Sequence, residues 1–130
     1  MPAAITAHHG THHSSLPLVS GLCLARAGHD DGYTAASAYA RRCAGEYVFE
    51  VEVDLACLEV LEVSVDAAEL LRRGGDYPGD HQSERDAFVA QGVDALAYAD
   101  EVLGISHQTI RLLSARALGA VTVTGVYDPA

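Results

Sequence analysis

The chain has 130 residues, 49% of them hydrophobic, and a formal net charge of −10, because 18 aspartates and glutamates face eight arginines and no lysine. This length fits a single domain over residues 1–130, with enough apolar content for a compact core. No apolar run approaches the length of a membrane span, and the first ten residues lack the features of a secretory signal, so we expect cytoplasmic residence. The acidity disfavours nonspecific nucleic-acid binding but is compatible with a nucleotide held by backbone N–H groups and one or two arginines.

Patterning in the first half of the chain predicts two strands and two helices. In order, these are a strand over 3–8, a short helix over 14–22, a polar turn over 28–32, a helix that Thr34 or Ser37 caps and Gly45 ends, and a strand over 46–54. The helix over 14–22 is expected because Ser14 or Ser15 can cap it and Gly21 stands where helices stop. The strand over 46–54 is the clearest element, since apolar and acidic residues alternate along it.

The second half predicts further strands with helices inserted between them. The expected order is an extended or turn-rich segment over 57–63, a helix over 66–73, a loop over 74–80, a helix over 83–91, strands over 93–98 and 108–113, a helical turn over 114–118 and a strand over 120–126. This is no regular βαβα alternation, so the predicted fold class is α+β. A GxGxxG fingerprint and a Walker A loop are both absent.

Three cysteines, at positions 23, 43 and 57, are odd in number and form no CxxC pair, which disfavours a disulfide framework. Histidines stand at positions 8, 9, 12 and 13, but neighbours on a strand point to opposite faces, so no metal site is expected. One histidine is the better candidate, because His9 stands with Gly10 and Thr11 at the end of a strand. His9 can donate a hydrogen bond to a ribose hydroxyl, Gly10 allows close backbone approach by a ligand, and Thr11 adds a hydroxyl.

Two tyrosines and two carboxylates are further candidates. Tyr33, after a polar turn, can either stack on a ring such as nicotinamide or pack between helix and sheet, whereas Tyr39, midway along a helix, suits packing. Asp100 and Glu101 follow a predicted strand. A carboxylate facing a cleft there can stabilise an oxocarbenium ion or accept a proton from a nucleophile; the alternative is that both are ordinary turn carboxylates.

Taken in order, these segments resemble the ADP-ribosyltransferase superfamily, in its His-Tyr-Glu branch of diphtheria-toxin-like and poly-ADP-ribose-polymerase-like enzymes. The family's first motif, a strand ending in Tyr-His-Gly-Thr followed by a helix and Gly-Leu, is similar to residues 8–11 and 21–22. Its second motif, a strand with Tyr-x-Thr or Tyr-Thr and then a helix ending near Tyr-Ala, is similar to residues 33–34 and 39–40. Later segments of the family resemble residues 45–54, 92–98 and 108–112, so the resemblance covers about residues 7–123.

The resemblance implies a split antiparallel β-sandwich with short helices, and NAD bound in its cleft as a substrate. His9 would bind a ribose hydroxyl, the Gly10 backbone next to Thr11 would hold the nicotinamide amide, and Tyr33, with Tyr39 in the same motif, would stack on the ring. Nicotinamide would then leave, and a nucleophile of the target would attack the ribose carbon.

The third motif of the family usually holds a glutamate, and this position falls near Gln108. Glutamine carries no charge, so it stabilises an oxocarbenium ion less and cannot act as a base. Gln108 and Asp100, which lies in the preceding turn as in small phage members, are therefore rival third residues, with Glu101 behind them.

The leading prediction is transfer of ADP-ribose from NAD to a protein or nucleic-acid target, with nicotinamide released. Small bacterial and phage members of the family act as toxins and anti-CRISPR enzymes, so an antitoxin or immunity partner is a further expectation. One alternative is a noncatalytic acidic interaction or inhibitor protein on a degenerate ADP-ribosyltransferase fold, and another is an NAD hydrolase. An RNA 2′-phosphotransferase would need several basic residues around His-Gly-Thr, where this chain offers only Arg26.

Overall fold

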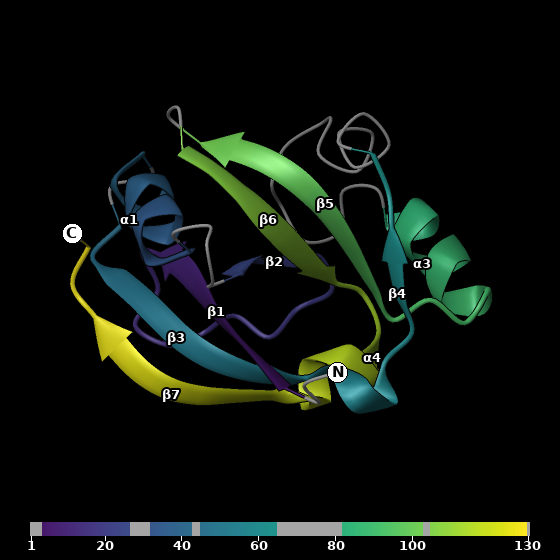
Figure 1. Ribbon diagram of the computed structural model, residues 1–130. Helices are drawn as coiled ribbons and strands as arrows, with labels where there is room; N and C mark the ends of the chain where they lie inside the picture. The colour runs from purple at the N-terminus through teal and green to yellow at the C-terminus, as the bar shows by residue number, and fades with distance from the viewer. Residues whose placement is uncertain (1–3, 27–31, 43–44, 65–81, 103–104, 130) are drawn as a thin grey trace.

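The computed structural model describes residues 4–26, 32–42, 45–64, 82–102 and 105–129. In this part of the chain, seven strands form one mixed sheet in the order β4-β5-β6-β2-β1-β3-β7 (Figure 1). The strands are β1 (Ala4–Thr11), β2 (Leu22–Arg26), β3 (Tyr47–Asp54), β4 (Val60–Glu62), β5 (Ala95–Val102), β6 (Ile105–Leu112) and β7 (Val121–Tyr127). The helices are α1 (Gly32–Arg42), α3 (Gln82–Ala90), α4 (Ala115–Gly119) and the 3-10 helix η1 (Leu55–Cys57). This architecture confirms the α+β class.

The sheet is weakly joined between β1 and β2. β1 pairs with β3 along its whole length, from Ala4 to Thr11, but with β2 only where Ala7 faces Arg26 and His8 faces Ala25. The sheet therefore divides into two halves, β1-β3-β7 and β2-β6-β5-β4. Figure 1 shows β3 and β7 on one side of β1 and β5 and β6 on the other.

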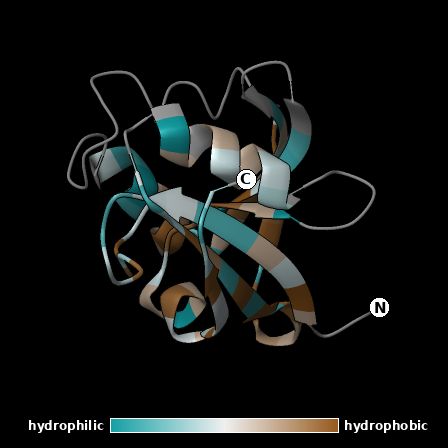
Figure 2. Ribbon diagram, turned by 90° about the vertical axis from the view of Figure 1, so that its left-hand side faces the viewer, coloured by the Kyte–Doolittle hydropathy of each residue, from teal (hydrophilic) through white to brown (hydrophobic). Residues whose placement is uncertain are grey.

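The larger hydrophobic core lies on one face of both halves, which we call the core face. Successive residues of a strand point to opposite faces, so alternate residues of each strand enter this core, and hydrophobic and hydrophilic residues alternate along the strands in Figure 2. Its buried members are Ile5, Ala7, Leu22, Leu24, Phe49, Val51, Val53, Ala95, Ala97, Ile110, Leu112 and Ala117. One core shared by both halves holds them together where the backbone pairing is short.

The opposite face is covered by α1 and α3, and we call it the helix face. Alanines of α1 pack against Ala25 of β2 and Val48 of β3. Phe88 of α3 packs against a separate cluster that includes Leu96 and Tyr98 of β5. On the helix face, α1 therefore lies over the middle of the sheet and α3 lies towards the β5 side.

Gly10 allows α1 to lie directly on the backbone of β1. A Cβ built on Gly10 would lie 2.0 Å from the carbonyl oxygen of Ala36 and 2.9 Å from Cβ of Ala40. The sequence predicts a close approach at Gly10 by a ligand, and this expectation is corrected: on the helix face, the group that approaches the α-carbon is the helix itself. The small side chains of α1 contribute to the same short separation.

The predicted helix over 14–22 is wrong. Residues 12–15 form bends, residues 16–19 are irregular, residues 20–21 form a turn, and Leu22 begins β2. Leu22 and Leu24 are buried in the core, where β2 pairs with β6, so burial and long-range pairing prevail over local capping signals. Gly21 does adopt a positive φ of 95°, but in the turn that leads into β2.

Asp100 and Glu101 do not lie in a turn after a strand, as predicted, but inside β5. The strand continues to Val102 because it pairs with β6 as far as Ile105. The helix over 66–73, the loop over 74–80 and most of the turn over 28–32 lie outside the described residues. The expected cap at Thr34 or Ser37 is wrong, because α1 begins at Gly32 and both residues lie inside it. The other predicted elements are confirmed within a few residues. No helix in the described ranges is long and apolar enough to cross a membrane.

Asp94 joins three elements at the end of the sheet near α4. Its carboxylate accepts hydrogen bonds from the Glu59 N–H, at 2.9 Å, and from the Ser114 hydroxyl, at 2.6 Å. Ser114 in turn caps α4 by accepting from the Ala117 N–H. Chiefly through the Glu59 N–H and then the Ser114 hydroxyl, these donors lower the pKa of Asp94 from its ordinary value, while its burial opposes them.

Gly10→Ala should destabilise the fold by about 1–3 kcal/mol or more, because the added methyl group overlaps the backbone of α1. Urea denaturation checks this. Gly119→Ala is the matched control, since a Cβ there meets no atom within 4 Å, and it should cause no loss. Equal stability of the Gly10→Ala variant and wild type would contradict the close packing of α1 on β1.

Asp94→Asn should destabilise the protein at neutral pH by about 1–3 kcal/mol. The NH2 group of asparagine would face the Glu59 N–H or the Ser114 hydroxyl, which are themselves hydrogen-bond donors. The folded pKa of Asp94 is lowered, so its contribution is present above the ordinary pKa of 3.8 and is lost as the pH falls below that value. Urea denaturation of both proteins against pH should show their difference constant near neutrality and shrinking in acid. A difference that is largest in acid would overturn this role.

Candidate functional site

The sheet separates the predicted site residues onto two faces. His9, Thr11 and Gln108 lie on the core face. His9 is opposite Phe49, and Gln108 alternates with the buried Ile110. On the helix face lie Tyr33 in α1 and Asp100 in β5. The structure thus gathers only part of the predicted set.

His9 is held in one tautomer at the point where β1 and β2 separate. Its Nδ1 lies 2.7 Å from the carbonyl oxygen of Cys23, which can only accept, so Nδ1 carries the hydrogen. Burial lowers the pKa of His9; the Cys23 carbonyl partly opposes this and His13 adds to it. The ring is therefore neutral near pH 7 and its Nε2 is an acceptor. The expectation that His9 donates to a ribose hydroxyl is accordingly reversed: the hydroxyl would donate to Nε2.

Arg26 and Gln108 form a pair that the sequence analysis did not identify. They lie side by side on β2 and β6, one position beyond the paired Ala25 and Thr109, and the Arg26 guanidinium donates to Gln108 Oε1 at 3.0 Å. This bond orients the amide of Gln108, whose N–H groups point away from Arg26. The alternation of Arg26 with Leu22 and Leu24 was the available signal that it faces the core side.

Tyr47 is the tyrosine that shares the face of His9. It lies opposite Thr11 in the β1–β3 ladder, is half-buried, and its ring lies 6.4 Å from that of Phe49 with an interplanar angle of 30°. The sequence predicts Tyr47 only as part of the buried side of a strand. Its position next to Thr11 makes it a flat surface within reach of a ligand bound there.

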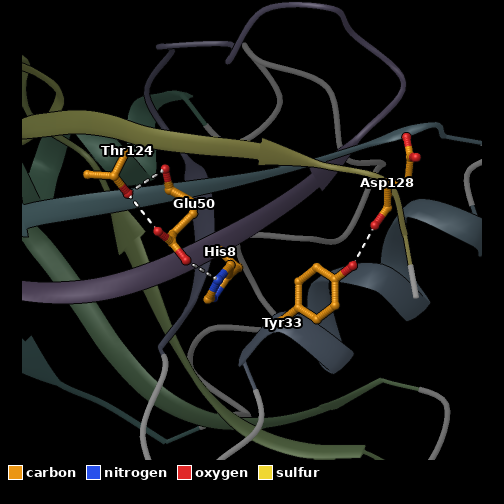
Figure 3. A network of polar contacts seen from close by, with 5 residues as sticks. All are labelled: His8, Tyr33, Glu50, Thr124 and Asp128. Carbon is orange, nitrogen blue, oxygen red and sulfur yellow. Dashed lines mark hydrogen bonds and ion pairs between the residues drawn. The ribbon is translucent and has the colours of Figure 1, made fainter.

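Tyr33 packs on the helix face instead. It lies in α1, its ring is edge-on to His8 at 5.8 Å, and its hydroxyl donates to the backbone carbonyl of Asp128 (Figure 3). His8 Nε2 lies 3.4 Å from Glu50, which accepts a hydrogen bond from Thr124. The observed contacts therefore match the packing alternative for Tyr33. The strand before α1, β2, carries no tyrosine, so the second motif is not placed as the resemblance implies.

Asp100 lies on the helix side of β5, opposite His107 of β6, and is thus on the other face from Gln108. Glu101 pairs with Ser106, but its side chain, like that of Tyr39, lies outside the described part of the structure. Within the described ranges, no three His, Cys, Asp or Glu side chains converge as metal ligands would.

Three kinds of group thus share the core face on either side of the junction of β1 and β2. His9 offers a neutral acceptor, Arg26 and Gln108 offer donors, one of them cationic, and Tyr47 offers an aromatic ring. These suit a ligand that combines hydroxyls, anionic oxygens and a planar ring. No protein-family model, curated protein or solved structure matches the chain.

His9→Asn should remove part of the pH dependence of stability. Asparagine places an amide N–H near the position of Nδ1, so it keeps the bond to Cys23 but does not titrate. Because the folded pKa of His9 is lowered, wild type loses stability as the pH falls below the unfolded value of about 6.5. Urea denaturation between about pH 8 and about pH 5 should show a smaller fall for the variant.

The matched control is His12→Asn, which changes an exposed histidine of the same segment and should retain the wild-type pH dependence. If the His9→Asn variant loses as much stability in acid as wild type does, His9 is not held as a neutral ring in the folded protein.

Proposed function

We propose that this chain binds NAD on the core face beside the junction of β1 and β2, and transfers its ADP-ribose to a macromolecular target with release of nicotinamide. The observation that carries the proposal is His9. The histidine of the first motif is fixed by Cys23 with Nε2 as an acceptor, and it shares its face with Gln108 at the position of the third motif. A split β-sandwich of the ADP-ribosyltransferase type is part of the same proposal, and the short β1–β2 pairing supports it.

Each of three side chains binds a different part of NAD. A ribose hydroxyl donates to His9 Nε2, the Arg26 guanidinium pairs with diphosphate oxygens, and Tyr47 supplies a surface for a planar ring. In the transfer step, the C–N bond between ribose and nicotinamide breaks, and its electron pair leaves with nicotinamide. A lone pair of the target then attacks the ribose carbon, and the nucleophile loses its proton to a base.

Three residues are candidates for the group that assists the breaking of the C–N bond. Gln108 is uncharged and its oxygen is already bonded to Arg26, so it orients the ligand rather than stabilising positive charge. Asp100 is on the helix side of β5. Glu101, the remaining candidate of the third motif, is the residue we assign to the oxocarbenium ion from its sequence position alone.

The Arg26–Gln108 pair also favours a second candidate, an acidic NAD-binding or inhibitor protein without transfer. A guanidinium beside the third-motif position opposes the positive charge of an oxocarbenium ion. An NAD hydrolase, in which water replaces the target, shares the bond-breaking step. Binding without nicotinamide release identifies the noncatalytic candidate, and free ADP-ribose identifies the hydrolase.

Calorimetric titration of the purified chain with NAD should show micromolar binding, and chromatography should detect nicotinamide when the target is present. His9→Asn removes one acceptor and should weaken binding roughly 3- to 10-fold, the loss expected for one hydrogen bond. His12→Asn should bind as wild type. No heat with folded wild-type protein, or equal affinity in the His9→Asn variant, would refute the proposal.

Two tyrosine variants, titrated with NAD in the same way, test whether the ligand binds on the core face or on the helix face. Tyr47→Ala should weaken NAD binding, whereas Tyr33→Ala removes the ring and the bond to Asp128 on the helix face and should leave the NAD affinity of the folded protein unchanged. Weaker NAD binding by the Tyr33 variant, with unchanged binding by the Tyr47 variant, would place the ligand on the helix face with Tyr33 as the stacking residue.

A further inference from the structure

β7 is an edge strand that exposes apolar side chains. It stands at the end of the strand order with β3 as its neighbour, so no described strand pairs with the backbone groups on its other side (Figure 1). Val123, Val126 and Tyr127 are 47%, 52% and 46% exposed, which makes β7 the strand with the most exposed large hydrophobic residues in the described sheet.

Natural edge strands are protected by lysine, proline, bulges or short length. β7 is seven residues long and contains neither proline nor any charged residue, in a chain of net charge −10. It has one protective feature, a register shift at Thr124, which leaves a segment for pairing on either side. Val121 and Val123 face Val53 and Val51 of β3, so their side of the strand continues the core face outwards.

We infer that β7 pairs antiparallel with β7 of a second copy of this chain, about a two-fold axis near Thr124. Every copy offers the same uncharged, β-branched strand, so the two edges complement each other without another partner. The opposite edge of the sheet is β4, which has only three residues, so pairing through β7 closes as a dimer rather than extending into a fibre.

The charges near this edge decide the direction of pairing. In the antiparallel arrangement, the two Asp128 residues are eight residue steps apart, about 26 Å, and the two Glu50 residues are three strand spacings apart, about 14 Å. Both distances exceed the Debye length of about 8 Å at physiological salt, so their repulsion is screened. Parallel pairing would place the two Asp128 residues side by side.

Multi-angle light scattering and sedimentation equilibrium, from micromolar to millimolar protein, test the inference on the unmodified chain. We expect the mass to rise from 13.7 kDa towards twice that value. Added salt should strengthen the dimer because it screens the net charge, whereas a complex with a basic contaminant would weaken. Hydrogen exchange of residues 121–127 should slow as concentration rises.

Val123→Lys introduces a charge into the paired strands and should abolish the dimer, with unchanged circular dichroism. Val89→Lys on α3, at a valine 38% exposed, makes the same change in net charge and should still dimerise. A mass of one chain at every concentration, or a dimer that survives Val123→Lys with unchanged exchange in β7, would overturn the inference. NAD binding plays no part in this result, so it stands apart from the proposed function.

Discussion

The contact between α1 and the backbone of β1 at Gly10 is the constraint on which the arrangement of the candidate site depends. With no side chain at Gly10, the carbonyl oxygen of Ala36 occupies the space of a Cβ. The helix therefore closes the helix face over the end of β1. Polar residues that alternate with Gly10, above all His9 and Thr11, are left on the core face, where β1 parts from β2.

The parting of β1 from β2 gives His9 its chemical state. Where the backbone ladder stops, the carbonyl of Cys23 accepts from the imidazole, and burial keeps the ring neutral. A neutral ring with a fixed Nδ1–H presents an acceptor, whereas the neighbouring guanidinium of Arg26 presents donors. In the proposed function, the acceptor for a hydroxyl and the donors for an anion thus come from opposite halves of the sheet, which are held together by one shared core.

Much of the fold could be predicted from local patterns, but the gathering of the site could not. The strand over 46–54 shows its burial in its own alternation, and the cap at Ser114 needs only neighbouring residues. The helix over 14–22 failed because Leu22 and Leu24 are buried through pairing with β6, which no local signal reports. Arg26 and Gln108 are 82 residues apart in sequence, and only the register of β2 with β6 brings them together.

In the proposed function, His9 is a neutral Nδ1–H ring whose Nε2 accepts a hydrogen bond from NAD, and His8 on the other face takes no part. Nitrogen-15 NMR of the histidine rings measures this directly, because each nitrogen reports its own protonation and hydrogen bonding. We expect a neutral Nδ1–H tautomer for His9 near pH 7, and a shift of its Nε2 resonance on addition of NAD while the Nε2 resonance of His8 stays unchanged. An Nε2–H tautomer for His9, or a response to NAD confined to His8, would contradict it.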